Sequence, residues 1–166
     1  MSERWNSFRS ETIINGIIKN PYSIFRLELQ ETLKKSVGTF TDKRILVPAS
    51  GDNREVFAFH LLGAKVTSSD ISENQLENSA QVAKKHGWNI EFIQDDVTHL
   101  SKIKSDAYDF VYISNGVMFW IEDLDSMYKN INRVLVPGGH YMMYDAHPFM
   151  YPFETDDTKN LTLKKL

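Results

Sequence analysis

One stretch of the sequence, residues 45–72, constrains the fold more than any other. Its first residues, Ile-Leu-Val at 45–47, are apolar without polar alternation, which is typical of a strand buried on both faces of a parallel sheet. Small residues at 49–51 mark a tight turn, and an apolar helical spacing follows. A second strand at 65–69 leads to Asp70. Strand, turn, helix and strand in this order predict the first unit of an open α/β sheet, whose ligands bind at the carboxyl ends of its strands.

The rest of the chain continues the alternation of helices and strands. Two helices precede the stretch, and later strands follow at a spacing that indicates right-handed crossovers in a doubly wound, mostly parallel sheet. The predicted helices are residues 11–19, 21–35, 72–86 and 122–134, and the predicted later strands are 89–94, 109–114 and 140–145, the last preceded by a turn at 137–139. We therefore expect one α/β domain with five strands.

Composition excludes several classes of function. The net charge of −3 provides no basic field, so nucleic acid is not an expected partner. The chain has no cysteine, which excludes disulfides and thiolate metal sites and fits a reducing compartment. No apolar run approaches the roughly 20 residues that span a bilayer, and the polar start lacks the apolar core of a signal peptide. Histidine and carboxylate spacings indicate no metal site. We expect a cytoplasmic protein without a membrane partner.

Small or polar residues follow four of the predicted strands. Gly51 follows the first, Asp70 the second, Asp96 the third and the pair 115–116 the fourth. Because the carboxyl ends of parallel strands meet at one rim, these groups should converge there. Asp70 lies about 20 residues after the glycine turn, and a carboxylate at this spacing can accept hydrogen bonds from the two hydroxyls of a ribose. Asp96 could accept a hydrogen bond from the exocyclic amine of adenine. The alternative is that these residues only cap helices and form turns.

The turn after the first strand distinguishes between nucleoside ligands. A dinucleotide loop needs the spacing G-x-G-x-x-G, whereas only Gly51 is present here. Asp52 and Glu55 fall in the first turn of the following helix, where they would repel a pyrophosphate. Acidic residues at this place favour a ligand with a positive amine or sulfonium.

With these features, residues 44–148 resemble a class I S-adenosylmethionine-dependent methyltransferase of the kind that acts on small molecules. The segments that carry the resemblance are ILVPASGDN, GAKVTSSDIS, FIQDDVTHL, YDFVYISNGVMFWI and INRVLVPGGHYMMYDAHPF. The resemblance implies a Rossmann-like sheet of order 3-2-1-4-5, S-adenosyl-L-methionine as cofactor and a small-molecule methyl acceptor. It divides the chain into an N-terminal helical cap (1–43), a cofactor-binding core (44–148) and a C-terminal tail (149–166).

The resemblance also assigns roles to individual residues. Asp70 would hold the ribose, Ile71 would pack on the adenine, and Asp96 and Val97 would read the adenine edge. The residues assigned to the glycine loop and to the methionyl side of the cofactor are Ala49, Ser50, Gly51, Ser114, Asn115 and Gly116.

The chain departs from the family in its first loop. An ungapped match places Val47 where the family has an acidic residue, so the contact to the methionyl amine is lost or replaced. The family's three glycines correspond to Ala49, Gly51 and Asn53. Ala49 adds one methyl group, and Asn53 is the non-glycine residue that best accepts positive φ.

A second departure lies at the C-terminus. The family sheet generally has seven strands, the last two forming a hairpin beside the fifth, but this sequence stops at Leu166. The chain is thus either a fragment or a shortened form. The fifth strand is expected to be an unprotected edge with apolar residues on both faces. The tail, the N-terminal helices or a second subunit must cover it, which makes a homo-oligomer through this edge an expectation.

His147, just past the fifth strand, is the predicted general base for an acceptor that must lose a proton. The alternative is that its His-Pro pair only shapes a turn. Five aromatic residues are candidates for the wall of an acceptor pocket, with core packing as the alternative: Trp5, Phe119, Trp120, Phe149 and Tyr151. Two rival functions remain, namely a non-catalytic domain with a role in assembly and an NAD-dependent oxidoreductase.

Overall fold

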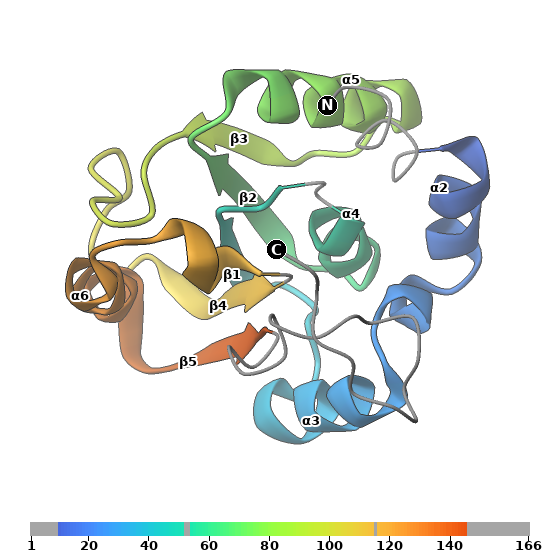
Figure 1. The fold of residues 1–166 in the computed structure, drawn as a ribbon. Coiled ribbons are helices and arrows are strands. Elements are labelled where there is room, and N and C mark those ends of the chain that lie inside the picture. Colours follow the sequence, from blue (N-terminus) through green and yellow to red (C-terminus); the bar gives the residue numbers. More distant parts are fainter. Residues whose placement is uncertain (1–9, 52–53, 115, 146–166) are drawn as a thin grey trace, which may run out of the picture.

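The fold is a parallel sheet with helices on both faces. The computed structural model describes residues 10–51, 54–114 and 116–145. Within these ranges, five parallel strands have the order β3-β2-β1-β4-β5, which confirms the expected order (Figure 1). The strands are β1 (Arg44–Pro48), β2 (Lys65–Asp70), β3 (Glu91–Gln94), β4 (Tyr108–Ser114) and β5 (Leu135–Tyr144).

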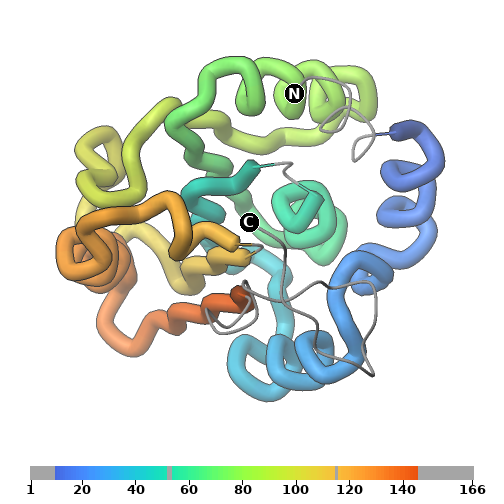
Figure 2. Tube along the Cα trace, in the orientation of Figure 1, coloured from blue at the N-terminus to red at the C-terminus, as the bar shows by residue number. Residues whose placement is uncertain are grey.

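Among the described residues, five α-helices and two short 3-10 helices connect and precede these strands. The α-helices are α2 (Glu11–Lys19), α3 (Leu27–Val37), α4 (Arg54–Leu61), α5 (Glu73–His86) and α6 (Leu124–Val134), and the 3-10 helices are η1 (Pro21–Ile24) and η2 (Val117–Trp120). Helix α6 lies on one face of the sheet, and α2 and α4 lie on the other (Figure 2). The bounds of α2 and the end of α5 at His86 agree with the sequence predictions.

Central strand β1 is buried on both faces, which explains its unbroken apolar run. Ile45 and Val47 belong to the core cluster on the side of α4, and Leu46 belongs to the cluster on the side of α6. All three side chains are at most 3% exposed. Packing on both faces places β1 at the centre of the sheet, where it pairs with β2 on one side and β4 on the other.

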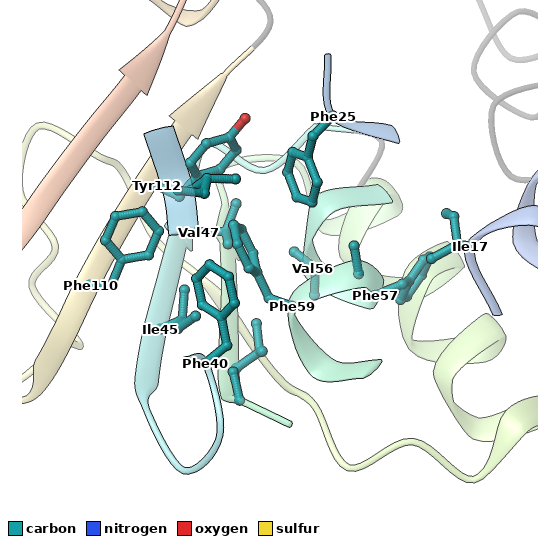
Figure 3. Packing of buried hydrophobic residues seen from close by; sticks show 14 of the residues in the cluster. Ile17, Phe25, Phe40, Ile45, Val47, Val56, Phe57, Phe59, Phe110 and Tyr112 are labelled. Carbon is teal, nitrogen blue, oxygen red and sulfur yellow. The ribbon is translucent and has the colours of Figure 1, made fainter. Parts of the chain in front are cut away.

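The N-terminal segments are anchored in the core by an aromatic cluster. The ring of Phe25 lies 5.4 Å from that of Phe59 in α4 and 6.1 Å from that of Tyr112 in β4 (Figure 3). Leu29 and Leu33 of α3 belong to the same cluster. The described N-terminal helices therefore pack on the sheet, and none of their residues lines the main cavity described below.

The prediction of one helix over residues 21–35 is wrong. Helix η1 ends at Ile24, Phe25 is extended (φ −93°, ψ 137°), and α3 begins at Leu27. The break turns Phe25 into the core, where it is 4% exposed. The side-chain amide of Gln30 donates to the carbonyls of Tyr22 and Phe25, so the interrupted helix does not leave them unsatisfied. Tertiary packing thus overrides helical propensity here.

The start of the fifth strand also differs from the prediction. The expected turn at 137–139 lies inside β5, which pairs with β4 from Leu135 onward. Tyr108 pairs with Leu135 and Phe110 with His140, so the added residues form a bulge. A Cβ atom at Gly139 would lie 2.9 Å from the carbonyl oxygen of Val136, which explains the glycine. Beyond the bulge, β5 forms one edge of the described sheet, as expected.

None of the helices in the described ranges is long and apolar enough to cross a bilayer.

Candidate functional site

A cavity of about 550 Å³ opens at the carboxyl rim of the sheet. Its lining residues follow the ends of β1, β2, β3 and β4: Ala49, Ser50, Gly51, Asp70, Ile71, Asp95, Asp96, Val97, Thr98, Ser114, Gly116, Val117, Trp120, Ile121, Glu122 and Asp123. Every predicted cofactor-binding residue lines it except Asn115, which lies outside the described residues. The structure thus brings the predicted residues together, while their roles toward a ligand stay predictions.

The carboxylate of Asp70 is held at this rim by two hydrogen bonds. It ends β2, and it is only 8% exposed. One carboxylate oxygen accepts a hydrogen bond from the backbone N–H of Gly51 at 2.9 Å, and the other accepts from the N–H of Ser72 at 2.8 Å. These bonds tie the turn after β1 to the turn after β2. Each oxygen keeps a further lone pair for a ligand hydroxyl, so the geometry suits a vicinal diol.

Hydrogen bonds to β2 hold the turn after β1 in place. The backbone N–H of Ser50 donates to the carbonyl of Ser69 at 3.1 Å, and the hydroxyls of Ser50 and Ser68 lie 3.0 Å apart. Gly51 has a positive φ of 59°, and so does Ala49, with φ 48°. The alanine thus adopts a left-handed conformation that favours glycine, and it is one of the lining residues of the cavity.

Asp95 and Asp96, the two acids after β3, make different contacts. Asp95, 8% exposed, accepts hydrogen bonds from the backbone N–H of Lys102 at 2.7 Å and from the hydroxyl of Ser101 at 3.2 Å, so it holds the following loop. Asp96 uses one oxygen to accept from the N–H and the hydroxyl of Thr98, both at 2.8 Å. The hydrogen bond from the backbone of Thr98 is the main cause that lowers the pKa of Asp96, and the hydroxyl of Thr98 lowers it further. Asp96 is therefore ionised at neutral pH. Its other oxygen lies 3.7 Å from Nδ1 of His99.

A buried carboxylate lies behind the end of β4. Ser114 is one of the lining residues of the cavity, and its hydroxyl donates to Oε1 of Glu55 at 3.2 Å. Glu55 is in the first turn of α4 and is 6% exposed. Burial, and then the negative charge of Glu55, raise the pKa of the Tyr112 phenol. The sequence indicated an acid at this place, although not its contact with Ser114.

The segment between β4 and α6 forms one wall of the cavity. The sequence analysis named Gly116 and Trp120 from this segment, and it missed Val117, Ile121, Glu122 and Asp123. Trp120 is 86% exposed and lines the cavity, whereas Phe119 is exposed outside it. Asp123 lines the cavity too, although its carboxylate accepts hydrogen bonds from the N–H and hydroxyl of Ser126 and caps α6. The residues of this segment lie just past the end of a parallel strand, and this position is the signal that could have identified all of them.

Several predicted residues lie outside the part of the chain that the structure describes. His147, the predicted base, lies outside the described residues, as do Trp5, Phe149 and Tyr151. Among the described histidines none lines the cavity, and His99 approaches it only through Asp96.

Residues 46–143 match the protein family described as "methyltransferase domain". This match covers more than half of the chain. The protein belongs to this methyltransferase family. The matched range runs from β1 into β5 and contains all the lining residues of the cavity.

Individual relatives are distant. The chain is 22% identical over 160 residues to a Bacillus subtilis (strain 168) protein named as an uncharacterized methyltransferase, YbaJ. The match covers 96% of this chain and 62% of that protein, so the chain spans less than two thirds of this relative.

Solved structures share the fold. An S-adenosylmethionine-dependent methyltransferase from Mesorhizobium loti is 24% identical with a TM-score of 0.63, over 74% of this chain and 55% of that one. A further one from Aquifex aeolicus is 18% identical with a TM-score of 0.61, over 77% of this chain and 70% of that one. At these identities the likeness shows the fold.

Proposed function

We propose that the protein transfers a methyl group from S-adenosyl-L-methionine to a small-molecule acceptor. Membership of the methyltransferase family supports the reaction class. The observation that carries the proposal is the placement of Asp70 and Asp96 on one cavity of about 550 Å³, a volume within the usual range of small-molecule sites. Asp70 offers paired acceptors for ribose hydroxyls, and Asp96 offers an acceptor for the adenine amine.

The lining residues fit the other parts of this cofactor as well. Ile71 is 69% exposed at the mouth of the cavity, and an apolar side chain that exposed gains burial when an aromatic ring packs on it. None of the described lining residues is basic, while five are acidic: Asp70, Asp95, Asp96, Glu122 and Asp123. Such a lining disfavours a pyrophosphate and suits a ligand with positive groups.

When bound, the cofactor supplies a methyl group already activated by a sulfonium, so the protein needs mainly to position the reactants and exclude water. Asp70 and Asp96 fix the nucleoside end. Trp120 provides an apolar wall on which an acceptor can pack. His147 is the residue we propose as base when the acceptor carries a proton at the attacking atom.

The test is methyl transfer itself. The protein is incubated with S-adenosyl-L-methionine and pools of small amines, phenols, thiols and carboxylic acids, and S-adenosylhomocysteine and methylated products are followed by mass spectrometry. The proposal expects product in at least one pool, and its loss in the Asp70→Ala variant. Tight cofactor binding without turnover in any pool would instead favour the non-catalytic alternative, and no cofactor binding would contradict the proposal.

A further inference from the structure

A short segment after β4 presents an aromatic ring and an acid on the same side of the chain. It consists of Trp120, which ends η2, followed by Ile121 and Glu122. Ile121 is extended (φ −106°, ψ 113°) and packs against the core cluster on the side of α6. Because side chains alternate along an extended chain, the side chains of Trp120 and Glu122 point away from that core. Both residues are exposed, and both line the cavity.

Glu122 differs in its contacts from the other four acids of the described lining. Those four accept hydrogen bonds from protein groups: Asp70, Asp95, Asp96 and Asp123. Glu122 forms no hydrogen bond or ion pair with any residue in the part of the chain that the structure describes. Its carboxylate is therefore available to a ligand in the cavity.

An indole ring beside a carboxylate favours an organic cation. The face of an indole ring carries negative charge density and attracts an ammonium group placed over it, and tryptophan is the best of the aromatic residues for this contact. Trp120 is 86% exposed, so its ring is open to such a group. The carboxylate of Glu122 adds a charge of the complementary sign. Since none of the described lining residues is basic, the cavity offers no partner for an anionic acceptor.

We propose, on the basis of the proposed function, that Trp120 and Glu122 bind an ammonium group of the methyl acceptor, which is therefore a small organic cation. Trp120 contacts the cation through its ring, and Glu122 contacts it through its charge. Both are specificity-determining residues for the acceptor. Asp70 and Asp96, at the ends of β2 and β3, hold the nucleoside instead. The acids of the lining lower the cost of placing a second cation in the same cavity as the sulfonium.

The test uses choline as the probe and 3,3-dimethylbutanol as its uncharged counterpart. The two molecules have nearly the same shape and the same hydroxyl group, and they differ in the positive charge. The protein is saturated with S-adenosylhomocysteine, each probe is added in turn, and the affinity is measured by NMR from the backbone amide signals. We expect choline to bind at least about fivefold more tightly, as for a cation over an indole ring with a carboxylate beside it.

Two variants assign this preference to the two residues. Glu122→Gln keeps the shape of the side chain and removes its charge, so choline should bind about two- to fivefold more weakly. Trp120→Leu keeps an apolar side chain and removes the aromatic ring, so choline should bind about three- to thirtyfold more weakly. In both variants the advantage of choline over 3,3-dimethylbutanol should shrink.

Asp125→Asn is the matched control for Glu122→Gln. Asp125 lies in the first turn of α6, pairs with Lys129 and does not line the cavity. Its substitution removes one negative charge from the same part of the molecule, so it reports the effect of net charge alone. We expect the affinity of this variant for choline to equal that of the wild type.

The possible results separate the inference from the proposed function. Equal binding of choline and 3,3-dimethylbutanol to the wild type, which needs no variant to fold, would overturn the inference. So would a loss in Glu122→Gln that Asp125→Asn reproduces. A loss of S-adenosylhomocysteine affinity in Glu122→Gln as large as its loss for choline would assign Glu122 to the cofactor and overturn the inference too. All three results leave the proposed function intact, whereas a wild type that does not bind S-adenosylhomocysteine overturns both.

Discussion

At the scale of single residues, Ala49 has an unfavourable backbone conformation at the rim of the sheet. Its φ of 48° is a conformation that glycine adopts freely and alanine does not. We expect Ala49→Gly to raise the free energy of unfolding by about 0.5–1 kcal/mol, measured by urea denaturation. Ala58→Gly is the control, because Ala58 lies within α4 and is fully buried, so that change should destabilise the protein. A loss of stability in both variants would contradict the assigned strain.

Asp70 is the residue on which ligand binding should depend most. Asp70→Ala removes the acceptor of the N–H groups of Gly51 and Ser72 and, in the proposed binding mode, the acceptor of the ribose hydroxyls. We expect the affinity for S-adenosylhomocysteine to fall by about 1–3 kcal/mol, the cost of leaving buried partners unpaired. Calorimetry measures the loss, and circular dichroism shows whether the fold is kept. If the folded variant binds S-adenosylhomocysteine as tightly as the wild type, Asp70 does not contribute to binding.

At the scale of elements, the sequence predicted the strands and their polar ends well, because buried parallel strands have unbroken apolar runs and end in turn residues. The acids at 70 and 96 and the turn at 49–51 were found in this way. Two features depend on contacts that are distant in sequence and were not predictable from local patterns. One is the break at Phe25, which is set by Phe59 and Tyr112. The other is the reach of Glu55 to Ser114.

The ion pair between β1 and β4 makes a pH-dependent contribution to the fold. The guanidinium of Arg44 donates to both oxygens of Asp109, at 2.9 and 3.1 Å, and lowers the pKa of that carboxyl. A lowered pKa in the folded state stabilises the protein fully above the unfolded pKa, about 3.9, and the stabilisation is lost as the pH falls through the folded value.

Asp109→Asn should therefore destabilise the protein at pH 7 by about 1 kcal/mol, a value limited by the half-exposed Arg44. The difference in unfolding free energy between wild type and variant should shrink below about pH 4. Urea denaturation at pH 7, 5 and 3.5 measures it. A difference that stays constant over this range would show that the charge of Asp109 does not contribute.

At the scale of the whole molecule, the β5 edge of the described sheet bears on whether the chain associates with a second copy. Within the described ranges β5 pairs only with β4, and its residues 141–144 are half-buried. A strand that has no second strand partner among the described residues favours pairing with another chain. We expect light scattering to show a mass that rises from monomer toward dimer with concentration. A monomer at all concentrations, with backbone amides of β5 that exchange freely with solvent, would contradict this.

The central claim is that the carboxyl rim of this sheet binds one adenosine through Asp70 and Asp96. Titration calorimetry of the wild-type protein with S-adenosylhomocysteine, and separately with NAD, tests it most directly. We predict micromolar binding of S-adenosylhomocysteine at one site per chain and no heat with NAD. Binding of NAD alone, or of neither ligand, would contradict the account.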